Sequence, residues 1–313
     1  MTELLLEKDY EVHGLVFHYD ENNALRLQHL IRDPKIFQKR LFLHPGDIDQ
    51  PQSLQLPLIK ADPDEVYHLA SQTHVGQSFE DVEKTCRVTG LGVLPLLEAV
   101  RHGGKPARFF HASSSQIFGN PEHSPQDETT PIAPTNPYGC AKAFATQIVR
   151  VYRESFKLFA INGIFYNHES PRRGKDFVTR KICRAAAAIK HGKQTELALG
   201  DTTVQRDWGH ARDYVRGIWL AMQQDTPEDF VFATGKMHSV QDIVEIAFQT
   251  VGLDWHKYVR RDERLVRPAE SIQLVGNPSK AKRLLNWEAE KTFSEIITEM
   301  TLAELQEFGG SNP

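Results

Sequence analysis

A tyrosine and a lysine four residues apart, Tyr138 and Lys142, stand at the head of an amphipathic stretch that runs to Phe156. On a helix, residues i and i+4 share one face, so this spacing places the phenol beside the ammonium group. A phenol with a solution pKa of about 10 is a poor base at neutral pH, and a neighbouring cation favours its phenolate form. The hydroxyl of Ser114 could then share a proton with this tyrosine over a carbinol of a substrate. These three side chains together are typical of hydride-transfer chemistry.

The elements around these residues must bring them together, because a Tyr-x-x-x-Lys pair alone is common by chance. The run Phe109-Phe-His-Ala-Ser-Ser-Ser115 predicts a strand with Ser114 near its end. Asn136-Pro137 is a helix-start signal directly before Tyr138. A strand end and a helix start are therefore predicted to present the serine and the tyrosine.

Composition limits the class of protein. The chain has 313 residues, a net charge of −4 and a pI near 6.4, which gives no general attraction to nucleic acid or to an anionic membrane. No apolar run reaches the roughly 20 residues of a membrane span, and the first residues lack the pattern of a signal peptide, so we expect a cytoplasmic protein. Cys86, Cys140 and Cys183 are too scattered for a disulfide framework or a zinc site. We expect buried, reduced thiols and no metal.

Periodicity predicts alternating strands and helices, which is the pattern of an α/β fold. Strands are expected to end near residue 16 and to cover 40–44, 65–69, 109–115, 158–166 and 230–235. Helices are expected over 51–60, over 79–102 with an interruption or a bend near Pro95, and over 138–156, 177–191, 212–223, 240–251, 280–285 and 293–305.

Several long motifs resemble one family. The stretch Phe109–Lys142 is similar to the extended short-chain dehydrogenase/reductase superfamily, and more closely to its GDP-mannose 4,6-dehydratase family. The resemblance continues through Asn167-His-Glu-Ser-Pro-Arg-Arg-Gly174, Phe177-Val-Thr-Arg-Lys181 and Arg206-Asp-Trp-Gly-His-Ala-Arg-Asp-Tyr-Val215. It implies a doubly wound, Rossmann-like parallel sheet with a smaller C-terminal lobe. Residues 1–165 would bind the dinucleotide, and 166–313 would mainly bind the nucleotide-sugar, interleaved with the end of the sheet.

The resemblance also implies roles for individual residues. The catalytic residues would be Ser114, Gln116, Tyr138 and Lys142. The cofactor would contact Asp47, Ile48, Leu69, Ala70, Ser71, Gln72, Thr73, Lys142, His168 and Arg173. The GDP-sugar substrate would contact Asn167, Val178, Lys181, Arg206, Arg267 and Glu270. By spacing alone, Asp47 is a turn residue.

The start of the sequence departs from this fold. No Gly-rich phosphate turn precedes the strand that ends near Val16, and the central first strand of a dinucleotide-binding sheet has no counterpart. We expect that this leaves two strand edges open in the middle of the sheet. A start assigned too late, or a shortened sequence, is one explanation; a chain that binds cofactor poorly is the other.

The choice of cofactor is open at the next loop. The family's Arg-Arg pair, which grips the 2′-phosphate of NADP, is replaced by Phe17-His18. Asp20 would suit the free ribose hydroxyl of NAD, whereas Arg26 could supply a phosphate contact. The resemblance implies NADP, with NAD as the alternative. It also implies a homodimer formed through the helix 138–156, with a tetramer as the alternative.

The main departure within the predicted site is Gln116, where the family has a glutamate. In the family reaction this carboxylate removes the C5 proton of the hexose after oxidation at C4; water then leaves C6 and hydride returns to C6. An amide lacks that basicity, and losing a positioned base typically costs about 10²–10⁴-fold in rate. Substitute bases near the motif would be His111, Glu122 or Asp127.

Three functions are therefore weighed. The leading one is a GDP-mannose 4,6-dehydratase that yields GDP-4-dehydro-6-deoxy-mannose. A GDP-sugar 4-reductase or 4-epimerase needs no C5 base, so Gln116 favours it, whereas the motifs at Asn167, Arg206 and Arg267 favour the dehydratase. A non-catalytic nucleotide-sugar-binding homologue would explain the absent Gly-rich turn.

Overall fold

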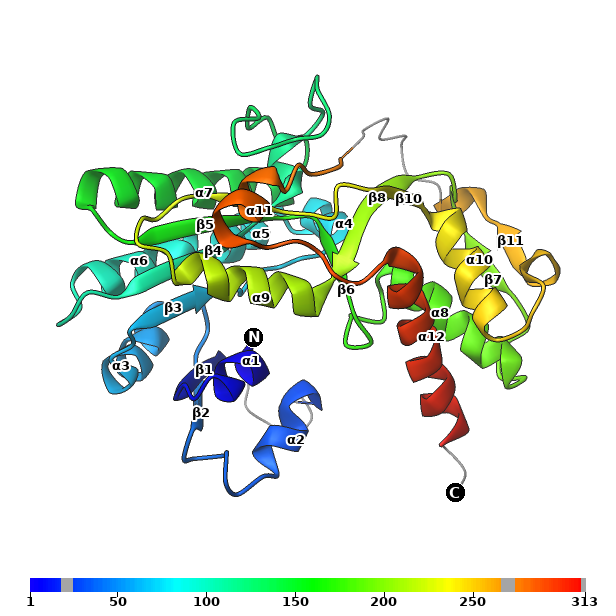
Figure 1. Cartoon of the computed structure of the whole chain (residues 1–313), viewed down its shortest axis with the longest axis horizontal. Helices are drawn as coiled ribbons and strands as arrows, with labels where there is room; N and C mark the ends of the chain where they lie inside the picture. The colour runs from blue at the N-terminus through cyan, green and yellow to red at the C-terminus, as the bar shows by residue number, and fades with distance from the viewer. Residues whose placement is uncertain (18–24, 266–273, 311–313) are drawn as a thin grey trace. The chain divides into compact units, whose positions relative to one another are not determined.

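The structure is a computed structural model that describes residues 1–17, 25–265 and 274–310. The chain divides into two compact units, each made of several segments (Figure 1). Unit 1 comprises Met1–Asn120, Thr130–Ile164 and Val215–Phe230, and unit 2 comprises Pro121–Thr129, Phe165–Tyr214 and Val231–Pro313. Strands and helices alternate along the chain, and the predicted α/β fold with parallel strand pairing is confirmed.

Unit 1 is built on parallel strands. Its strands are β1 (Val12–Val16), β2 (Leu41–Pro45), β3 (Glu65–His68), β4 (Arg108–Ser114) and β5 (Ala160–Phe165). Its helices are α1 (Thr2–Glu7), α2 (Gln28–Ile31), α3 (Gln52–Ala61), α4 (Val75–Glu80), α5 (Val82–Thr85), α6 (Val93–Arg101) and α7 (Pro137–Phe156). Helix α9 (Ala211–Met222) and strand β9 (Phe230–Phe232) each carry residues of both units. One sheet has the order β3-β4-β5-β9.

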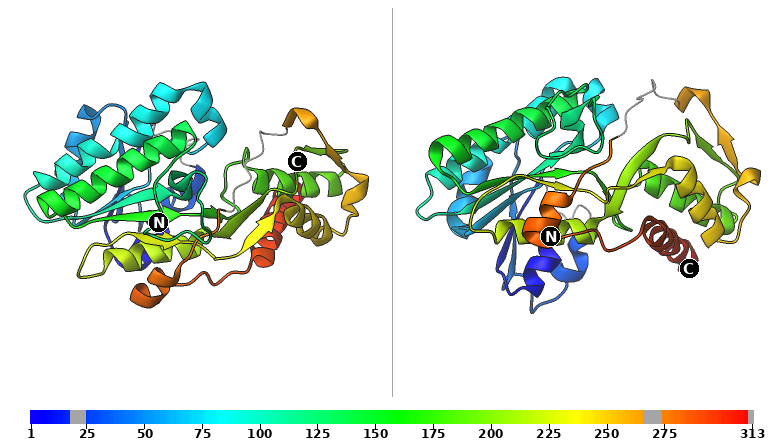
Figure 2. Two further views of the ribbon diagram at one scale, coloured as in Figure 1. Left: turned by 90° about the horizontal axis from the view of Figure 1, so that it is seen from above. Right: turned by 45° about the horizontal axis from the view of Figure 1, so that its top comes forward.

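Helix α7 forms where sequence signals predict it. The Asn136 side chain caps its first turn, Pro137 occupies the first turn, and Lys157 ends it in a left-handed conformation. Ala145 and Val149 of α7 pack on Phe109 of β4 in a buried cluster, so the helix lies along one face of the sheet (Figure 2). This packing fixes the N-terminal turn of α7 close to the end of β4.

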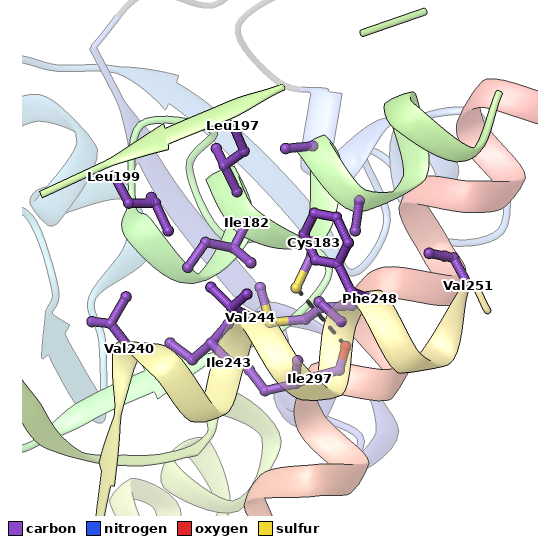
Figure 3. Packing of buried hydrophobic residues seen from close by; sticks show 14 of the residues in the cluster. Ile182, Cys183, Leu197, Leu199, Val240, Ile243, Val244, Phe248, Val251 and Ile297 are labelled. Atoms are coloured by element: carbon purple, nitrogen blue, oxygen red, sulfur yellow. Dashed lines mark hydrogen bonds between the residues drawn. The ribbon is translucent and has the colours of Figure 1, made fainter. Parts of the chain in front are cut away.

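Unit 2 has small sheets and a helical core. Its strands are β6 (Asn167–Glu169), β7 (Leu197–Leu199), β8 (Gln205–His210), β10 (Met237–Ser239) and β11 (Val259–Arg261). Its helices are α8 (Val178–Lys190), α10 (Val240–Thr250), α11 (Ser279–Leu285) and α12 (Phe293–Gly309). Figure 3 shows Cys183 of α8, Val244 of α10 and Ile297 of α12 packed together, with the Cys183 thiol donating to the Ile297 carbonyl at 3.9 Å. Both α10 and α12 begin with a capping box, at Ser239 and Thr292.

The expected opening in the sheet of unit 1 is present. Strands β1 and β2 pair only with each other, in parallel register from Val12 opposite Leu41 to Val16 opposite Pro45. No ladder joins this pair to β3-β4-β5-β9 in the part of the chain that the structure describes. One edge of β1 and one edge of β3 are thus without a strand neighbour.

The single helix predicted over residues 79–102 is wrong. Asp81 leaves the helical conformation and caps α5 by accepting from the Lys84 amide at 3.1 Å, which ends α4 one residue earlier. A π-helical segment, Cys86–Leu91, then separates α5 from α6. Pro95 does not bend the helix, because it lies in the first turn of α6, where a missing N–H costs no bond. Val82 and Leu91, two apolar residues of this stretch, are exposed.

Two smaller predictions also need correction. Of the three thiols, Cys183 is buried, whereas Cys140 is exposed and Cys86 is half-buried. The strand predicted over 230–235 ends at Phe232, because the amides of Thr234 and Gly235 donate to the Asp207 carboxylate at 2.9 Å instead of to a neighbouring strand.

Candidate active site

The predicted catalytic residues of unit 1 lie at the junction of β4 and α7. Ser114 is the last residue of β4 and is nearly buried. Its hydroxyl accepts from the backbone N–H of Gln116 at 3.3 Å. This bond starts a 3-10 turn over Ser115–Phe118. The strand therefore stops at the serine, and the turn carries Gln116 toward the start of α7.

Tyr138 and Lys142 share a buried face in the first turns of α7, as their spacing predicts. The Lys142 ammonium lies 5.9 Å from the centroid of the Tyr138 ring. It donates to the Ala112 carbonyl of β4 at 2.7 Å. Helix and strand are thus joined through this lysine.

Burial controls the charge of this lysine. Only 2% of Lys142 is exposed, and desolvation lowers the pKa of its ammonium to about 7. An ammonium has three donors, and the Ala112 carbonyl takes one of them. The remaining donors can serve the phenolate of Tyr138 and a hydroxyl of a bound ligand.

Gln116 is held by the residue that caps α7. Its amide oxygen accepts from the Asn136 side-chain nitrogen at 2.8 Å. The Asn136 oxygen accepts from the Gly139 amide, also at 2.8 Å. Sequence reasoning identified Asn136 only as a helix start; no short-range signal reveals its bond to a residue 20 positions earlier.

The loop after β3 is fixed by a residue that the sequence did not single out. Thr89, in the π-helical segment, accepts from the amide of Gln72 at 3.1 Å and from the hydroxyl of Ser71 at 3.2 Å. Gln72 also donates to the His74 carbonyl at 2.9 Å, and its side-chain oxygen is buried with no hydrogen-bond partner among the described residues. Leu69, Ala70 and Thr73 are exposed. The five predicted residues therefore form one loop, anchored at Thr89, that exposes Leu69, Ala70 and Thr73.

Asp47 and Ile48 lie after β2. Asp47 is a turn residue, as its spacing predicts: its carboxylate accepts from the Asp49 amide at 2.9 Å, and its own amide donates to Ser53 at 2.8 Å. Ile48 packs against the buried cluster beneath α7. Asp47 thus borders a surface pocket after β2, and Ile48 borders the core of unit 1.

Unit 2 carries the other predicted contacts. The His168 Nδ1–H donates to the Tyr166 carbonyl at 3.0 Å, and its ring stacks on Tyr214 with centroids 4.9 Å apart. Burial lowers the pKa of its imidazole to about 4. Arg173 pairs with the buried Glu169 at 3.3 Å and lies over the Phe177 ring at 3.6 Å. These two side chains are therefore fixed by neighbours within unit 2.

The predicted substrate residues of unit 2 are held mainly through backbone carbonyls. Asn167 donates to Asp207 at 3.3 Å, Lys181 to Ala198 at 3.0 Å and Arg206 to Gln205 at 2.7 Å. Val178 is at the start of α8 and is 36% exposed. Arg267 and Glu270 lie outside the described residues, as do His18 and Asp20 of the loop that bears on the choice of cofactor.

The proposed substitute bases receive no support. His111 has no exposed surface, so its imidazole cannot meet a substrate directly. Asp127 is used locally, accepting from the amide and hydroxyl of Thr129 at 2.9 and 2.6 Å. Glu122 is an exposed loop residue of unit 2. Across residues 1–17, 25–265 and 274–310, no three His, Cys, Asp or Glu side chains gather as metal ligands, and no helix there is long and apolar enough to cross a bilayer.

Solved structures show the same fold. RMD from Pseudomonas aeruginosa, in complex with NADPH, superposes with a TM-score of 0.80 at 21% identity, covering 95% of this chain and 98% of that one. DesIV, a dTDP-glucose 4,6-dehydratase from Streptomyces venezuelae with NAD and TYD bound, gives a TM-score of 0.82 at 21% identity, covering 98% and 93%.

Sequence relatives are closer. GDP-mannose 4,6 dehydratase 1 of Arabidopsis thaliana is 45% identical over 98% of this chain and 86% of its own length. The Homo sapiens GDP-mannose 4,6 dehydratase is 42% identical over 98% and 88%. Residues 1–300 match the family described as GDP-mannose 4,6 dehydratase. With its Ser114, Tyr138 and Lys142 assembled as described, the chain belongs to the GDP-mannose 4,6-dehydratase family.

Proposed function

We propose that this chain is a hydro-lyase that converts GDP-mannose to GDP-4-dehydro-6-deoxy-mannose. The observation that carries the proposal is the packing of Tyr138 and Lys142 on one buried face of α7 beside the end of β4. Family membership over nearly the whole chain supports the GDP-sugar as substrate. The residues of unit 2 that would bind it are Asn167, Val178, Lys181 and Arg206.

The side chains of unit 1 account for the chemistry at C4. Ser114 and Tyr138 would hold the C4 hydroxyl between them, and the tyrosine would take its proton. Lys142, fixed on Ala112, stabilises the phenolate that makes this transfer possible. The loop at Ser71 and Gln72 would exclude water from one side of the sugar.

The residues of unit 1 fit the nicotinamide half of a dinucleotide. Lys142 keeps donors beyond the one spent on Ala112. Such donors suit the hydroxyl oxygens of a ribose. The cofactor, NADP or its alternative NAD, supplies the acceptor and later the donor of hydride when bound. Arg173 and His168 are the proposed contacts in unit 2.

A second function is favoured by one observation. Gln116 stands where the family's C5 base is expected, and its amide oxygen is already engaged by Asn136. An amide has no useful basicity. A GDP-sugar 4-reductase or 4-epimerase needs hydride transfer at C4 without proton removal at C5, so it would use the same serine, tyrosine and lysine.

We further propose that the protein acts in the cytoplasm as a homodimer formed through α7. Phe144 and Val151 lie two turns apart on this helix. Phe144 is 40% exposed and Val151 is 46% exposed. Apolar side chains at this spacing form a stripe that a second copy of the helix can cover.

Replacement of Tyr138 by Phe tests the proposed function. We expect water loss from GDP-mannose, followed by mass spectrometry with NADP or NAD, to fall by at least about 10²-fold because the C4 proton has no acceptor. GDP-mannose binding, measured by calorimetry, should be retained. Tyr152→Phe is the matched control, since Tyr152 lies on the same helix and bonds Glu98 outside the site. Unchanged turnover in Tyr138→Phe would show that this tyrosine is not the base.

A further inference from the structure

The orientation of the Gln116 amide follows from a backbone group. The Gly139 N–H can only donate, so the side-chain atom of Asn136 that faces it must be the oxygen. The other end of that amide, the nitrogen, therefore faces Gln116 and donates to it at 2.8 Å. The Gln116 oxygen is consumed by this bond. Its nitrogen makes no hydrogen bond within the described residues and carries two N–H donors on a half-buried side chain.

The same contacts fix Gln116 relative to Tyr138. A Cβ atom on Gly139 would lie 2.5 Å from the Gln116 carbonyl oxygen, so the backbone of residue 116 touches the first turn of α7. The backbone N–H of Gln116 also donates to the Ser114 hydroxyl at 3.3 Å. The backbone of residue 116 is thus fixed between Ser114 and the first turn of α7, the turn that carries Tyr138.

We propose that Gln116 donates a hydrogen bond to an oxygen of the bound hexose, and that Asn136 is the positioning residue that fixes this polarity. The inference rests on the proposed function, because it needs a hexose at Ser114 and Tyr138. A donor at this place stabilises negative charge on a sugar oxygen and takes no proton from carbon. The identity of residue 116 then sets the balance between hydride transfer at C4 and loss of water.

The structure also indicates what a carboxylate would do at this position. In Gln116→Glu, the Asn136 N–H would hold one carboxylate oxygen, and the second oxygen would replace the free amide nitrogen. Asn136 is therefore already placed to hold a carboxylate at position 116, and only the carboxylate is missing. A positioned base contributes about 10²–10⁴-fold to rate.

Three variants distinguish the effect of a base at position 116 from the effect of the Asn136 hydrogen bond that holds it. They are Gln116→Glu, Asn136→Ser and the double variant. Serine remains a good helix cap but has no N–H to offer residue 116, so the fold of α7 is preserved. Gln55→Glu is the control for added charge, because Gln55 is exposed on α3, away from this helix. We expect Gln116→Glu to raise water loss from GDP-mannose by at least about 10²-fold, the double variant to lose most of that gain, and Gln55→Glu to change little.

A readout independent of turnover tests the donor itself. The side-chain amide signals of Gln116 are assigned by their absence in Gln116→Glu, in protein with ¹⁵N-labelled glutamine. They should shift when GDP-mannose is added and stay in place with GDP, which lacks the hexose. Signals unmoved by bound GDP-mannose, or a Gln116→Glu variant no faster than the parent, would overturn the inference. If calorimetry detects no GDP-mannose binding to any variant, the proposed function itself fails.

Discussion

At the scale of single residues, two buried histidines make stability depend on pH. His68 of β3 and His111 of β4 stack with centroids 5.3 Å apart, and 3% and 0% of their surfaces are exposed. Burial lowers the pKa of His68 to about 3 and places that of His111 well below its usual value, with the Lys142 charge adding to both shifts. Both imidazoles are therefore neutral in the folded state near pH 5.

This gives a prediction for acid unfolding. Below about pH 6.5 the unfolded chain binds a proton at each histidine and the folded chain does not, so stability present at pH 7 falls as the pH drops toward 3. Each imidazole contributes a slope of about 1.4 kcal/mol per pH unit within this window. In His111→Gln, the free energy of unfolding measured in urea should fall less steeply between pH 6 and pH 4.5, by about 1.4 kcal/mol per pH unit. An unchanged slope would contradict the shift, and His102→Gln, at an exposed position, is the control.

The sequence identifies the residues proposed to react better than the residues that hold them in place by hydrogen bonds. Tyr138 and Lys142 are predictable because they share a face of one helix, which local spacing determines. The bond from Asn136 to Gln116 and the anchoring of the loop by Thr89 join residues 17 to 20 positions apart. Such contacts depend on how elements pack, and no local pattern contains them.

At the scale of elements, α7 and the segment before it show why some boundaries are predictable. Asn136-Pro137 starts α7 as its residue types predict. In the predicted helix 79–102, Asp81 has the same capping ability, but it stands within an apolar repeat that hides it. The π-helical segment then packs closely on α7, since a Cβ atom on Gly90 would lie only 3.5 Å from the Ala141 backbone.

Gly139 gives a prediction about the join between α7 and the 3-10 turn. Alanine is normally favoured over glycine within a helix by about 1 kcal/mol. Here its Cβ would lie 2.5 Å from the Gln116 carbonyl oxygen, so we expect Gly139→Ala to destabilise unit 1 by about 1–3 kcal/mol and to displace Gln116. Urea unfolding and GDP-mannose turnover should both decline. Gly104→Ala is the matched control, because a Cβ there meets no atom within 4 Å.

At the scale of the whole molecule, the sequence predicts the parallel sheet and the missing strand in its middle. It does not predict which contacts hold the separate β1-β2 pair in place. The pair β1-β2 has no ladder to β3-β4-β5-β9 among the described residues, and a two-stranded sheet is at best marginally stable alone. It depends on a small cluster of Leu5, Leu6, Val12, Leu30 and Leu41. Trp219 of α9 packs against this cluster, a contact between residues some 200 positions apart that periodicity cannot reveal.

Trp219 should therefore control the local stability of the β1-β2 pair. Its indole donates to the Tyr10 hydroxyl at 3.1 Å, and Lys8 lies over its ring at 3.5 Å. Trp219→Ala removes both contacts and part of the apolar cover, so we expect amides of β1 and β2 to lose about 2 kcal/mol or more of protection in native-state hydrogen exchange. Trp219→Phe keeps a ring without the N–H and should fall between the parent and alanine. Amides of β4 should remain protected in both variants, because its core around Phe109 does not include Trp219. Equal loss of protection in β1 and β4 would instead show that the two sheets unfold as one cooperative body.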